Sequence, residues 1–357
     1  MVDAVEHLVY AELLLSERRL DSARKAYDDA QLRGADWERC SAGRWMISML
    51  AGRFCEAWRE SDAIRLRGAA DPHRFWEGED LRGAHVIVRS LHGLGDAVQM
   101  LRYAPVLNAL ASRVVFEVPP RFVELARCFD RVDEVITWEG EEPVRKPEWN
   151  VQLEVMEFPY IFRTTESDLP LCTNYVRLKP EVVRSAADAL NPAVTARETM
   201  RIGMVWSGGD WDSERSVPFS LLHSCLQNTP GACQLAEFWS LQGGMVAQDA
   251  NGTNVRDAAS QCGSGLMGLA ATIANLDLVI TIDTLAAHLA GALGKPTWVL
   301  LQYAADWRWM VERPDSPWYP TVRLFRQKRP GDWSSVMQEV RDSLELLLKN
   351  APGPKTC

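Results

Sequence analysis

The sequence lacks several patterns that mark common classes of protein. Its most apolar stretch, between Leu276 and Leu301, is interrupted by Asp277, Asp283 and Lys295, so no run approaches the roughly 20 apolar residues that span a bilayer. It also lacks an excess of positive charge, because the formal net charge is −9 in 357 residues. Nucleic acids and anionic membranes are bound by basic surfaces. We therefore expect no nucleic-acid binding and at most peripheral association with a membrane.

Two further absences concern targeting and redox chemistry. The first 20 residues carry acidic side chains early and have the pattern of an amphipathic helix rather than of a secretory signal, which predicts a cytoplasmic protein. The eight cysteines include no Cys-x-x-Cys pair, so neither a zinc knuckle nor a thioredoxin-like centre is expected. Free thiols in a reducing compartment are the simplest interpretation.

The N-terminal segment is predicted to be helical over residues 4–67. Three of its positions recur with a period of about 34 residues: Leu20, Ala23 and Tyr27 correspond to Phe54, Ala57 and Ser61. This period, with a small residue at a helix crossing, is typical of tetratricopeptide repeats. We predict a module over residues 1–70, either of the tetratricopeptide type or a generic helical cap. Because two repeats bury little apolar surface, it should pack on the rest of the chain.

The following segment alternates strands and helices. Strands are expected at 85–90, 113–119, 132–138, 201–207, within 233–242, and at 277–282 and 297–302, with a long irregular stretch at 143–180. Buried strands that alternate with helices predict parallel sheets covered by helices. This alternation of strands and helices occurs in two successive segments, which predicts an α/β fold of two Rossmann-like lobes facing a cleft. The expected limits are 83–195 for the first lobe, 200–331 for the second and 332–350 for a bridging helix.

The first loop of chemical interest follows the strand at 85–90. Gly93 and Gly95 permit a tight turn and close approach of the backbone. Asp96 then stands at a helix start, at the carboxyl end of a strand, where α/β sheets bind their ligands. Asp96 is either a functional carboxylate or only a helix N-cap. The spacing differs from Gly-x-Gly-x-x-Gly, so a dinucleotide fingerprint is not supported.

A second loop precedes the helix expected at 285–293. Asp283 or Thr284 is expected to cap this helix, and the exposed N–H groups at its start can bind an anion. His288 lies about one helical turn further along. It is therefore either a neighbour of a bound anion or a core histidine.

A third loop, 206–219, contains Asp210 and Asp212 in an Asp-x-Asp pattern, which holds a metal ion in some transferases but is common by chance. Arg215 and Ser216, at an expected helix start, suit a phosphate better. We therefore expect no metal.

A fourth loop, 302–320, follows what we take as the last strand and is crowded with aromatic residues. These side chains either stack on a base or a sugar, or pack as structural residues. They are Trp307, Trp309, Trp318 and Tyr319.

Together the loops resemble glycosyltransferase family 9, the heptosyltransferase type, in bacterial proteins that carry tetratricopeptide repeats. Relatives of that family include the O-linked N-acetylglucosamine transferases. The resemblance covers about residues 83–345 and rests on the motifs HGLGDAVQMLRYAPVL, RIGMVWSGG…SERSVPFSLL, SLQGG, LDLVITIDTLAAHLAGALGKPTWVLL, DWRWM and SPWYPTVRLFRQ.

The resemblance implies a GT-B fold, with a nucleotide-diphosphate sugar in the second lobe and the acceptor in the first. It implies transfer with inversion, no obligatory metal and no cofactor, with Asp96 as the catalytic base. The implied donor-binding residues are Ser207, Gly208, Arg215, Gln242, Asp283, Thr284 and His288. The implied acceptor-side residues are Gly95, Gln99 and Arg102. The acceptor, whether a glycan, a lipid-linked saccharide or a protein, is left open.

One departure from the family pattern bears on function. Relatives often carry Asp-Thr where this chain has Gly268 and Leu269, so a polar contact or a helix cap near the donor is missing. A glycosyltransferase is the leading interpretation. The alternatives are a non-catalytic adaptor that keeps a GT-B shell, and an epimerase that alters the sugar nucleotide without an acceptor.

Overall fold

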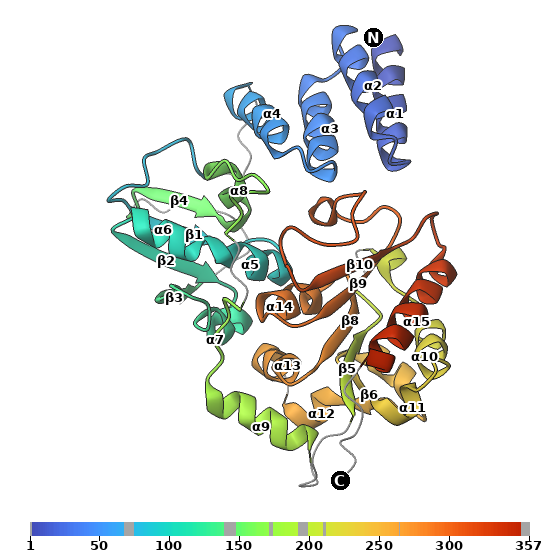
Figure 1. Cartoon of the computed structure of the whole chain (residues 1–357). Coiled ribbons are helices and arrows are strands. Elements are labelled where there is room, and N and C mark those ends of the chain that lie inside the picture. The colour runs from blue at the N-terminus through green and yellow to red at the C-terminus, as the bar shows by residue number, and fades with distance from the viewer. Residues whose placement is uncertain are drawn as a thin grey trace.

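The structure is a computed structural model that describes residues 2–67, 75–138, 148–170, 174–191, 199–209, 212–263 and 265–350. It consists of two parallel sheets flanked by helices, with a helical module at the N-terminal end (Figure 1). The predicted α/β fold class with a helical N-terminal module is therefore confirmed. The stretch at 68–74, between the module and the first lobe, and Asp210 lie outside the described residues.

The N-terminal module is made of two helical hairpins. Ala23 and Ala57, which recur in the sequence, are both fully buried in the second helix of a hairpin. This placement agrees with an internal repeat, whereas the tetratricopeptide assignment stays a prediction. The helices are α1 (Val2–Ser16), α2 (Leu20–Leu32), α3 (Trp37–Leu50) and α4 (Phe54–Arg67).

The module shares a hydrophobic core with the first lobe. Phe54 and Trp58 of α4 belong to the main core cluster of the chain. The Trp58 indole Nε1 donates a hydrogen bond of 2.7 Å to the Thr164 carbonyl, and Asp62 forms an ion pair with Arg163 at 2.7 Å. The predicted packing of the module on the following segment is thus present.

The module also contacts the second lobe, which the sequence did not lead us to expect. The Val311 amide donates to the Leu50 carbonyl at 3.1 Å, and the Tyr303 hydroxyl donates to the Glu17 carbonyl at 2.7 Å. Because these contacts and the shared core hold the module on both lobes, its deletion would expose apolar surface of the remaining chain.

The first sheet has four parallel strands in the order β3-β2-β1-β4. Its strands are β1 (His85–Arg89), β2 (Arg113–Val118), β3 (Glu134–Thr137) and β4 (Val151–Glu154). Helices α5 (Leu94–Met100), α6 (Ala104–Leu110), α7 (Val123–Ala126) and α8 (Phe158–Ile161) accompany them. Strand β4 pairs with β1, within the stretch that we expected to be irregular, and its four residues are all buried.

The second sheet has six parallel strands in the order β10-β9-β8-β5-β6-β7. They are β5 (Met200–Val205), β6 (Ala236–Ser240), β7 (Arg256–Asp257), β8 (Leu278–Ile282), β9 (Thr297–Leu301) and β10 (Val322–Arg326). The expectation that the chain's last strand precedes the aromatic loop was wrong, because β10 follows that loop and pairs with β9.

Helices of the second half pack around this sheet. They are α10 (Phe219–Gln227), α11 (Ala232–Leu235), α12 (Ala258–Cys262), α13 (Gly265–Ala274), α14 (Leu285–Ala292) and α15 (Trp333–Asn350). Helix α9 (Pro180–Leu190) packs on α12 and α13, and α15 packs on α10, α11 and β10. The lobe limits and the bridging role of the last helix stay predictions.

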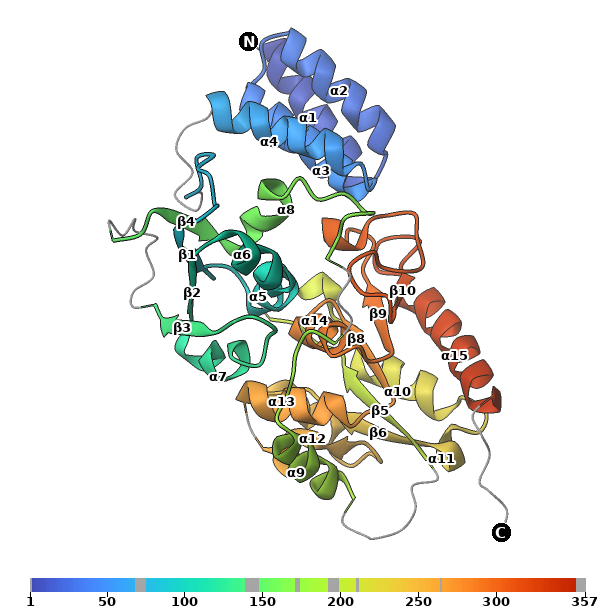
Figure 2. The same cartoon turned by 60° about the vertical axis from the view of Figure 1, so that its left-hand side comes forward.

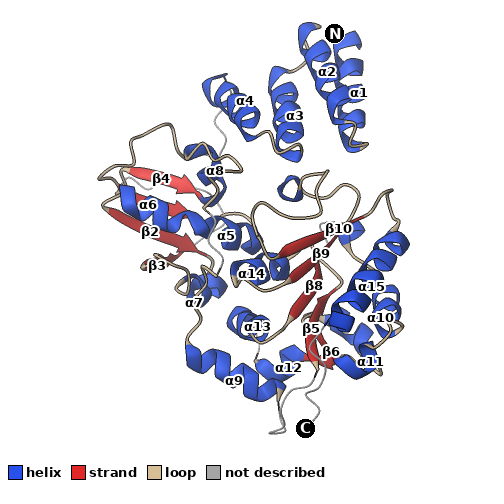
Figure 3. Ribbon diagram, in the orientation of Figure 1, coloured by secondary structure: helices blue, strands red, loops and turns tan. Residues whose placement is uncertain are grey.

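The two sheets stand apart, and the elements between them define where a ligand can bind. Helix α5 of the first lobe packs against α14 of the second (Figures 2 and 3). Both helices begin directly after a central parallel strand, β1 and β8 respectively. The carboxyl ends of these strands therefore meet in one region, as expected for ligand sites in α/β folds.

Candidate functional site

A cleft of about 590 Å³ lies between the lobes at this meeting point. It contains nine of the eleven residues that the resemblance had assigned, whose roles stay predictions. These nine are Gly95, Asp96, Ser207, Gly208, Arg215, Gln242, Asp283, Thr284 and His288. Gln99 and Arg102 do not line it, whereas Arg121, Leu269, Asp306 and Arg308, which had not been assigned, do.

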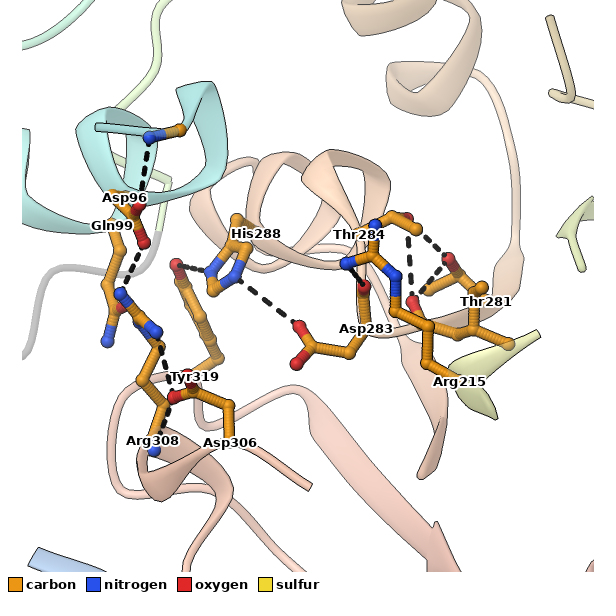
Figure 4. A network of polar contacts seen from close by, with 12 residues as sticks. Asp96, Gln99, Arg215, Thr281, Asp283, Thr284, His288, Asp306, Arg308 and Tyr319 are labelled. Carbon is orange, nitrogen blue, oxygen red and sulfur yellow. Dashed lines mark hydrogen bonds and ion pairs between the residues drawn. The ribbon is translucent and has the colours of Figure 1, made fainter. Parts of the chain in front are cut away.

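Asp96 lies in the first turn of α5 and is bound from two sides. Its Oδ2 accepts a hydrogen bond of 3.0 Å from the Gly93 amide, which occupies the N-cap position. Its Oδ1 accepts from Nη2 of Arg308, a residue of the second lobe (Figure 4). The possibility that Asp96 is itself the N-cap was wrong, because it occupies the third helical position.

Arg308 is a buried cation that connects the two lobes. Its Nη1 lies 2.8 Å from Asp306 Oδ1, and its Nε donates to Gln99 Oε1 at 2.7 Å. This arginine belongs to the Asp-Trp-Arg-Trp-Met motif, but no role was predicted for it from the sequence. The available signal was a charged residue between two tryptophans, a pattern typical of a cation held against aromatic rings.

The lobes approach each other most closely at Gly95 and His288. A Cβ atom at Gly95 would lie 2.8 Å from Cδ2 of His288, closer than real Cβ contacts allow. Only glycine therefore permits α5 to pack against α14 in this way.

His288 is buried, and its ring stacks on Trp309 with 5.5 Å between ring centroids. Burial, with the nearby guanidinium groups of Arg308 and Arg102, lowers its pKa well below the ordinary value, so the imidazole is neutral at neutral pH. Its Nδ1 lies 3.0 Å from the Tyr319 hydroxyl. Because burial keeps the pKa of Tyr319 well above its ordinary value, that phenol can donate to Nδ1 and leave the proton on Nε2.

The start of α14 offers backbone donors to the cleft. Thr284 occupies the N-cap position, but its side chain makes no capping hydrogen bond. Its hydroxyl instead lies 3.1 Å from the Thr281 hydroxyl. The expected cap by Thr284 is therefore absent, and the helix dipole points its positive end into the cleft.

Arg215 brings a positive charge to the same end of the cleft. Its Nη1 donates to the Asp283 carbonyl at 3.1 Å. A Cβ atom at Gly208 would lie 2.3 Å from Nε of Arg215, so this glycine makes room for the guanidinium. An arginine beside a helix N-terminus is an arrangement that suits phosphate oxygens.

Gln242 fixes the neighbouring loop. Its Oε1 accepts hydrogen bonds from the amides of Trp206 and Ser207 at 3.2 and 3.0 Å, and its Nε2 donates to the Ser207 carbonyl at 3.1 Å. The side chain thus shapes the loop that presents Ser207 and Gly208 to the cleft.

The Asp283 carboxyl group is electrostatically unusual. Burial, with the nearby charge of Asp306, raises its pKa to about 6. Its Oδ1 lies 3.8 Å from Nε2 of His288. Since this imidazole is neutral, the pair is a polar contact rather than a full salt bridge.

The two assigned residues outside the cleft lie behind its wall. Arg102 is fully buried, donating to the Trp318 carbonyl at 2.5 Å, and its guanidinium lies 4.7 Å from the centre of the Tyr319 ring. Gln99 is buried and holds Arg308. Neither side chain faces the cleft. Gln99 holds Arg308, which lines the cleft, whereas Arg102 contacts Trp318 and Tyr319, which pack behind the cleft wall.

The Asp-x-Asp pattern is described only at its second residue, so the metal interpretation stays open. Asp212 accepts a hydrogen bond of 2.6 Å from Gln302 Nε2, and Asp210 is outside the described residues. Within the described ranges, no group of three or more His, Cys, Asp or Glu side chains is arranged to hold a metal ion.

The aromatic loop packs inward rather than lining the cleft, since Trp309, Trp318 and Tyr319 are nearly inaccessible to solvent. Gly268 also has a structural explanation, because a Cβ there would lie 2.2 Å from the Gly263 carbonyl oxygen. The departure at Gly268 is thus required by packing, and Leu269 adds an apolar contact to the cleft wall.

Comparison with known proteins identifies the architecture. No family model matches the chain. Two solved structures are similar to it, a glycosyl transferase of family 9 from Veillonella parvula and the Escherichia coli ADP-heptose lipopolysaccharide heptosyltransferase II. Their TM-scores are 0.56 and 0.54, their identities 13% and 14%, and they cover 76% and 74% of this chain and 99% and 98% of their own. The chain has the same fold as these two glycosyltransferases.

A curated relative is similar in sequence. Protein FlbA of Caulobacter vibrioides is 26% identical over 340 residues, which cover 84% of this chain and 54% of that protein. The chain therefore spans about half the length of this relative. In the part of the chain that the structure describes, no helix is both long and apolar enough to cross a membrane.

Proposed function

We propose that the chain is a glycosyltransferase that moves a sugar from a nucleotide-diphosphate sugar to an acceptor hydroxyl. The observation that carries the proposal is the cleft between the lobes. One side of the cleft presents the Asp96 carboxylate. The other side presents the Arg215 guanidinium and the N-terminus of α14, where the Thr284 side chain makes no capping hydrogen bond. This pairing of a proton acceptor with an anion site is what glycosyl transfer from a diphosphate requires.

The donor would bind the second lobe through its diphosphate. Helix α14 supplies backbone N–H groups, Arg215 supplies a fixed positive charge, and His288 supplies a neutral N–H donor at Nε2. These groups need no reorganisation when charge develops on the leaving group, which is the condition for electrostatic stabilisation of a transition state. Because the arginine and the helix neutralise that charge, no metal ion is needed in this proposal.

The acceptor would approach from the first lobe. Its hydroxyl oxygen forms a bond to the anomeric carbon while the bond from that carbon to the diphosphate oxygen breaks. The hydroxyl proton passes to the Asp96 carboxylate, and the nucleoside diphosphate leaves with the electron pair. Attack opposite to the leaving group inverts the anomeric configuration. Arg308 acts as a positioning residue, since it orients Asp96 by a direct hydrogen bond.

The proposal is tested by a thermal-shift panel of nucleoside diphosphates and nucleotide sugars. A ligand that binds only the folded chain raises its apparent stability by mass action. We expect at least one nucleoside diphosphate to raise the melting temperature and its sugar conjugate to release nucleoside diphosphate slowly to water. Binding without any turnover would support the adaptor alternative, isomerisation of the sugar nucleotide the epimerase, and absence of binding would overturn the donor site.

A further inference from the structure

A second cavity, of about 330 Å³, lies where the helical module meets both lobes. Helices α3 and α4 form one wall and α8 another, and Figure 2 places α8 next to these two helices. Its lining residues are Ala42, Trp45, Met49, Trp58, Ser61, Ile64, His92, Glu154, Met156, Glu157, Pro159, Tyr160 and Trp307. We call it the junction cavity.

The junction cavity adjoins the interlobe cleft through two loops. His92 lines the junction cavity, and the next residue, Gly93, lines the cleft. In the same way, Trp307 lines the junction cavity and its neighbour Arg308 lines the cleft. Arg308 stands between the two, because its Nη2 bonds Asp96 on the cleft side and lies 3.7 Å from Met156 Sδ on the other.

The aromatic walls offer carbon surface rather than polar atoms. The Trp58 indole N–H is bonded to the Thr164 carbonyl at 2.7 Å, and the Tyr160 hydroxyl is bonded to Asp62 at 2.7 Å. Trp45 and Trp307 meet edge to face with 5.7 Å between ring centroids. Because the polar atoms of Trp58 and Tyr160 are bonded elsewhere, these two rings contribute carbon surface to the cavity.

The polar part of the cavity is close to electrically neutral. His92 Nδ1 lies 3.0 Å from Oε1 of the buried Glu154, and this hydrogen bond raises the pKa of His92. Burial raises the pKa of Glu157 to about 7, so a large part of this group is protonated at neutral pH. Glu154, which is paired with His92, and the partly protonated Glu157 attract a cation only weakly. The protonated form of Glu157 can donate a hydrogen bond to a ligand hydroxyl, and carboxylate oxygens can accept one.

These features discriminate between possible ligands. Both carboxyl groups already accept hydrogen bonds, Glu154 from the Met156 amide and Glu157 from the Glu154 amide. A hydrocarbon chain would offer no acceptor to the O–H of protonated Glu157, which is costly. A cationic side chain would gain from the aromatic rings but would find little net negative charge. A sugar ring carries C–H groups on its faces and hydroxyls around its edge, which matches rings on the walls and carboxyl groups at one end. The volume falls at the small end of the range for ligand cavities.

We propose that the junction cavity binds one uncharged pyranose ring of the acceptor, held between Trp45, Trp58 and Trp307 with its hydroxyls toward His92 and Glu157. This proposal rests on the proposed transferase function, because it is the adjoining cleft that makes the bound sugar an acceptor. It gives the helical module a direct part in acceptor choice, since α3 and α4 supply six of the thirteen lining residues.

The test uses the full chain and a set of neutral methyl pyranosides as probes, observed by saturation-transfer difference NMR at millimolar concentration. The blocking variant is Ala42→Trp, because Ala42 is exposed on α3 at the cavity and a larger side chain there removes no existing contact. The matched control is Lys25→Trp, at an exposed position of α2 that lines none of the described cavities. Glu157→Gln serves as a second variant that preserves shape.

We expect at least one pyranoside to bind the parent chain and Lys25→Trp, and to bind Ala42→Trp and Glu157→Gln at least tenfold more weakly. Nucleoside diphosphate affinity should be the same in all four proteins, so a failure of the donor site is read separately. No binding by any pyranoside, equal binding in the blocked variant, or preferential binding of choline or a serine-containing peptide would overturn the proposal.

Discussion

Arg308 of the second lobe donates a hydrogen bond to the Asp96 carboxylate of the first lobe, across the cleft that separates the two sheets. The same guanidinium also bonds Gln99 and Asp306. Because Asp96 and Gln99 both lie on α5, one buried cation fixes the orientation of this helix end relative to the second lobe. The geometry of the proposed base therefore depends on how the lobes are packed.

We predict that Arg308→Lys lowers the rate of transfer while the chain still folds. A single ammonium group keeps the charge but cannot bond Gln99, Asp96 and Asp306 in the fixed planar arrangement of a guanidinium. The measurement is kcat for donor turnover, with circular dichroism as a check on folding. Arg313→Lys is the control, because Arg313 pairs with Asp315 and Glu166 outside the cleft. Equal kcat for the Arg308 variant and the parent would remove its positioning role.

We predict that Arg308→Leu destabilises the chain by about 3–5 kcal/mol, because it leaves the Asp96 and Asp306 carboxylates near each other without their shared cation. Urea denaturation at neutral pH measures the free energy of unfolding. A loss below about 1 kcal/mol, the usual worth of an exposed pair, would show that solvent replaces the interaction.

We predict that Arg215→Ala weakens nucleoside diphosphate binding by roughly 10- to 100-fold, which corresponds to the loss of a charged hydrogen bond. His288→Ala should weaken it also, through loss of a neutral donor beside α14. Isothermal titration calorimetry gives both affinities. Arg323→Ala, an exposed arginine of β10 outside the cleft, is the control. Unchanged affinity in both cleft variants would place the diphosphate elsewhere.

We predict that nucleoside diphosphate binding survives a metal chelator, because a helix N-terminus and an arginine supply the positive charge. Titration calorimetry with and without EDTA measures the effect. Complete loss of binding with EDTA, restored by added Mg²⁺, would favour a metal at the Asp-x-Asp loop.

We predict that Asp283→Asn stabilises the chain above pH 6 and leaves its stability unchanged below about pH 4. The pKa of Asp283 is about 6 in the folded chain against an ordinary value of 3.8, so the folded state binds the proton more tightly than the unfolded state. The free energy of unfolding therefore falls as pH rises between these values. The variant removes a cost on the order of 1–3 kcal/mol. Urea denaturation of the variant and the parent at pH 4 and pH 7.5 measures this difference. If the two proteins had the same free energy of unfolding at both pH values, ionised Asp283 would carry no burial cost and the prediction would be contradicted.

Much of the fold and most of the cleft could be predicted from the sequence, because the signals were local. Short loops between an apolar strand and a helix, such as the glycine-marked loop with Gly95 and the threonine-marked loop with Thr284, place functional groups at strand ends whatever surrounds them. Strand β4 escaped detection because Gln152 and Glu154 are buried polar residues, which erase the apolar pattern of a buried strand.

The residues that sequence reasoning misplaced depend on contacts between distant segments. Arg102 stands in the functional motif, yet it is buried among Tyr175, Trp318 and Tyr319, which lie far along the chain. Arg308 gains its importance only because the second lobe folds back on α5. The two tryptophans that flank Arg308 in the sequence indicate a cation held against aromatic rings, but they do not show where that cation lies. Only the three-dimensional arrangement identifies which arginine faces the cleft.

The most direct test of the account is the turnover of Asp96→Asn, measured as nucleoside diphosphate released from a bound nucleotide sugar. Asparagine can still accept the hydrogen bond from the Gly93 amide, but it cannot take a proton. The account predicts unchanged nucleoside diphosphate affinity and a rate lower by roughly 10²-fold or more. Near-normal release by the variant would contradict it and would leave Asp96 with only a structural role.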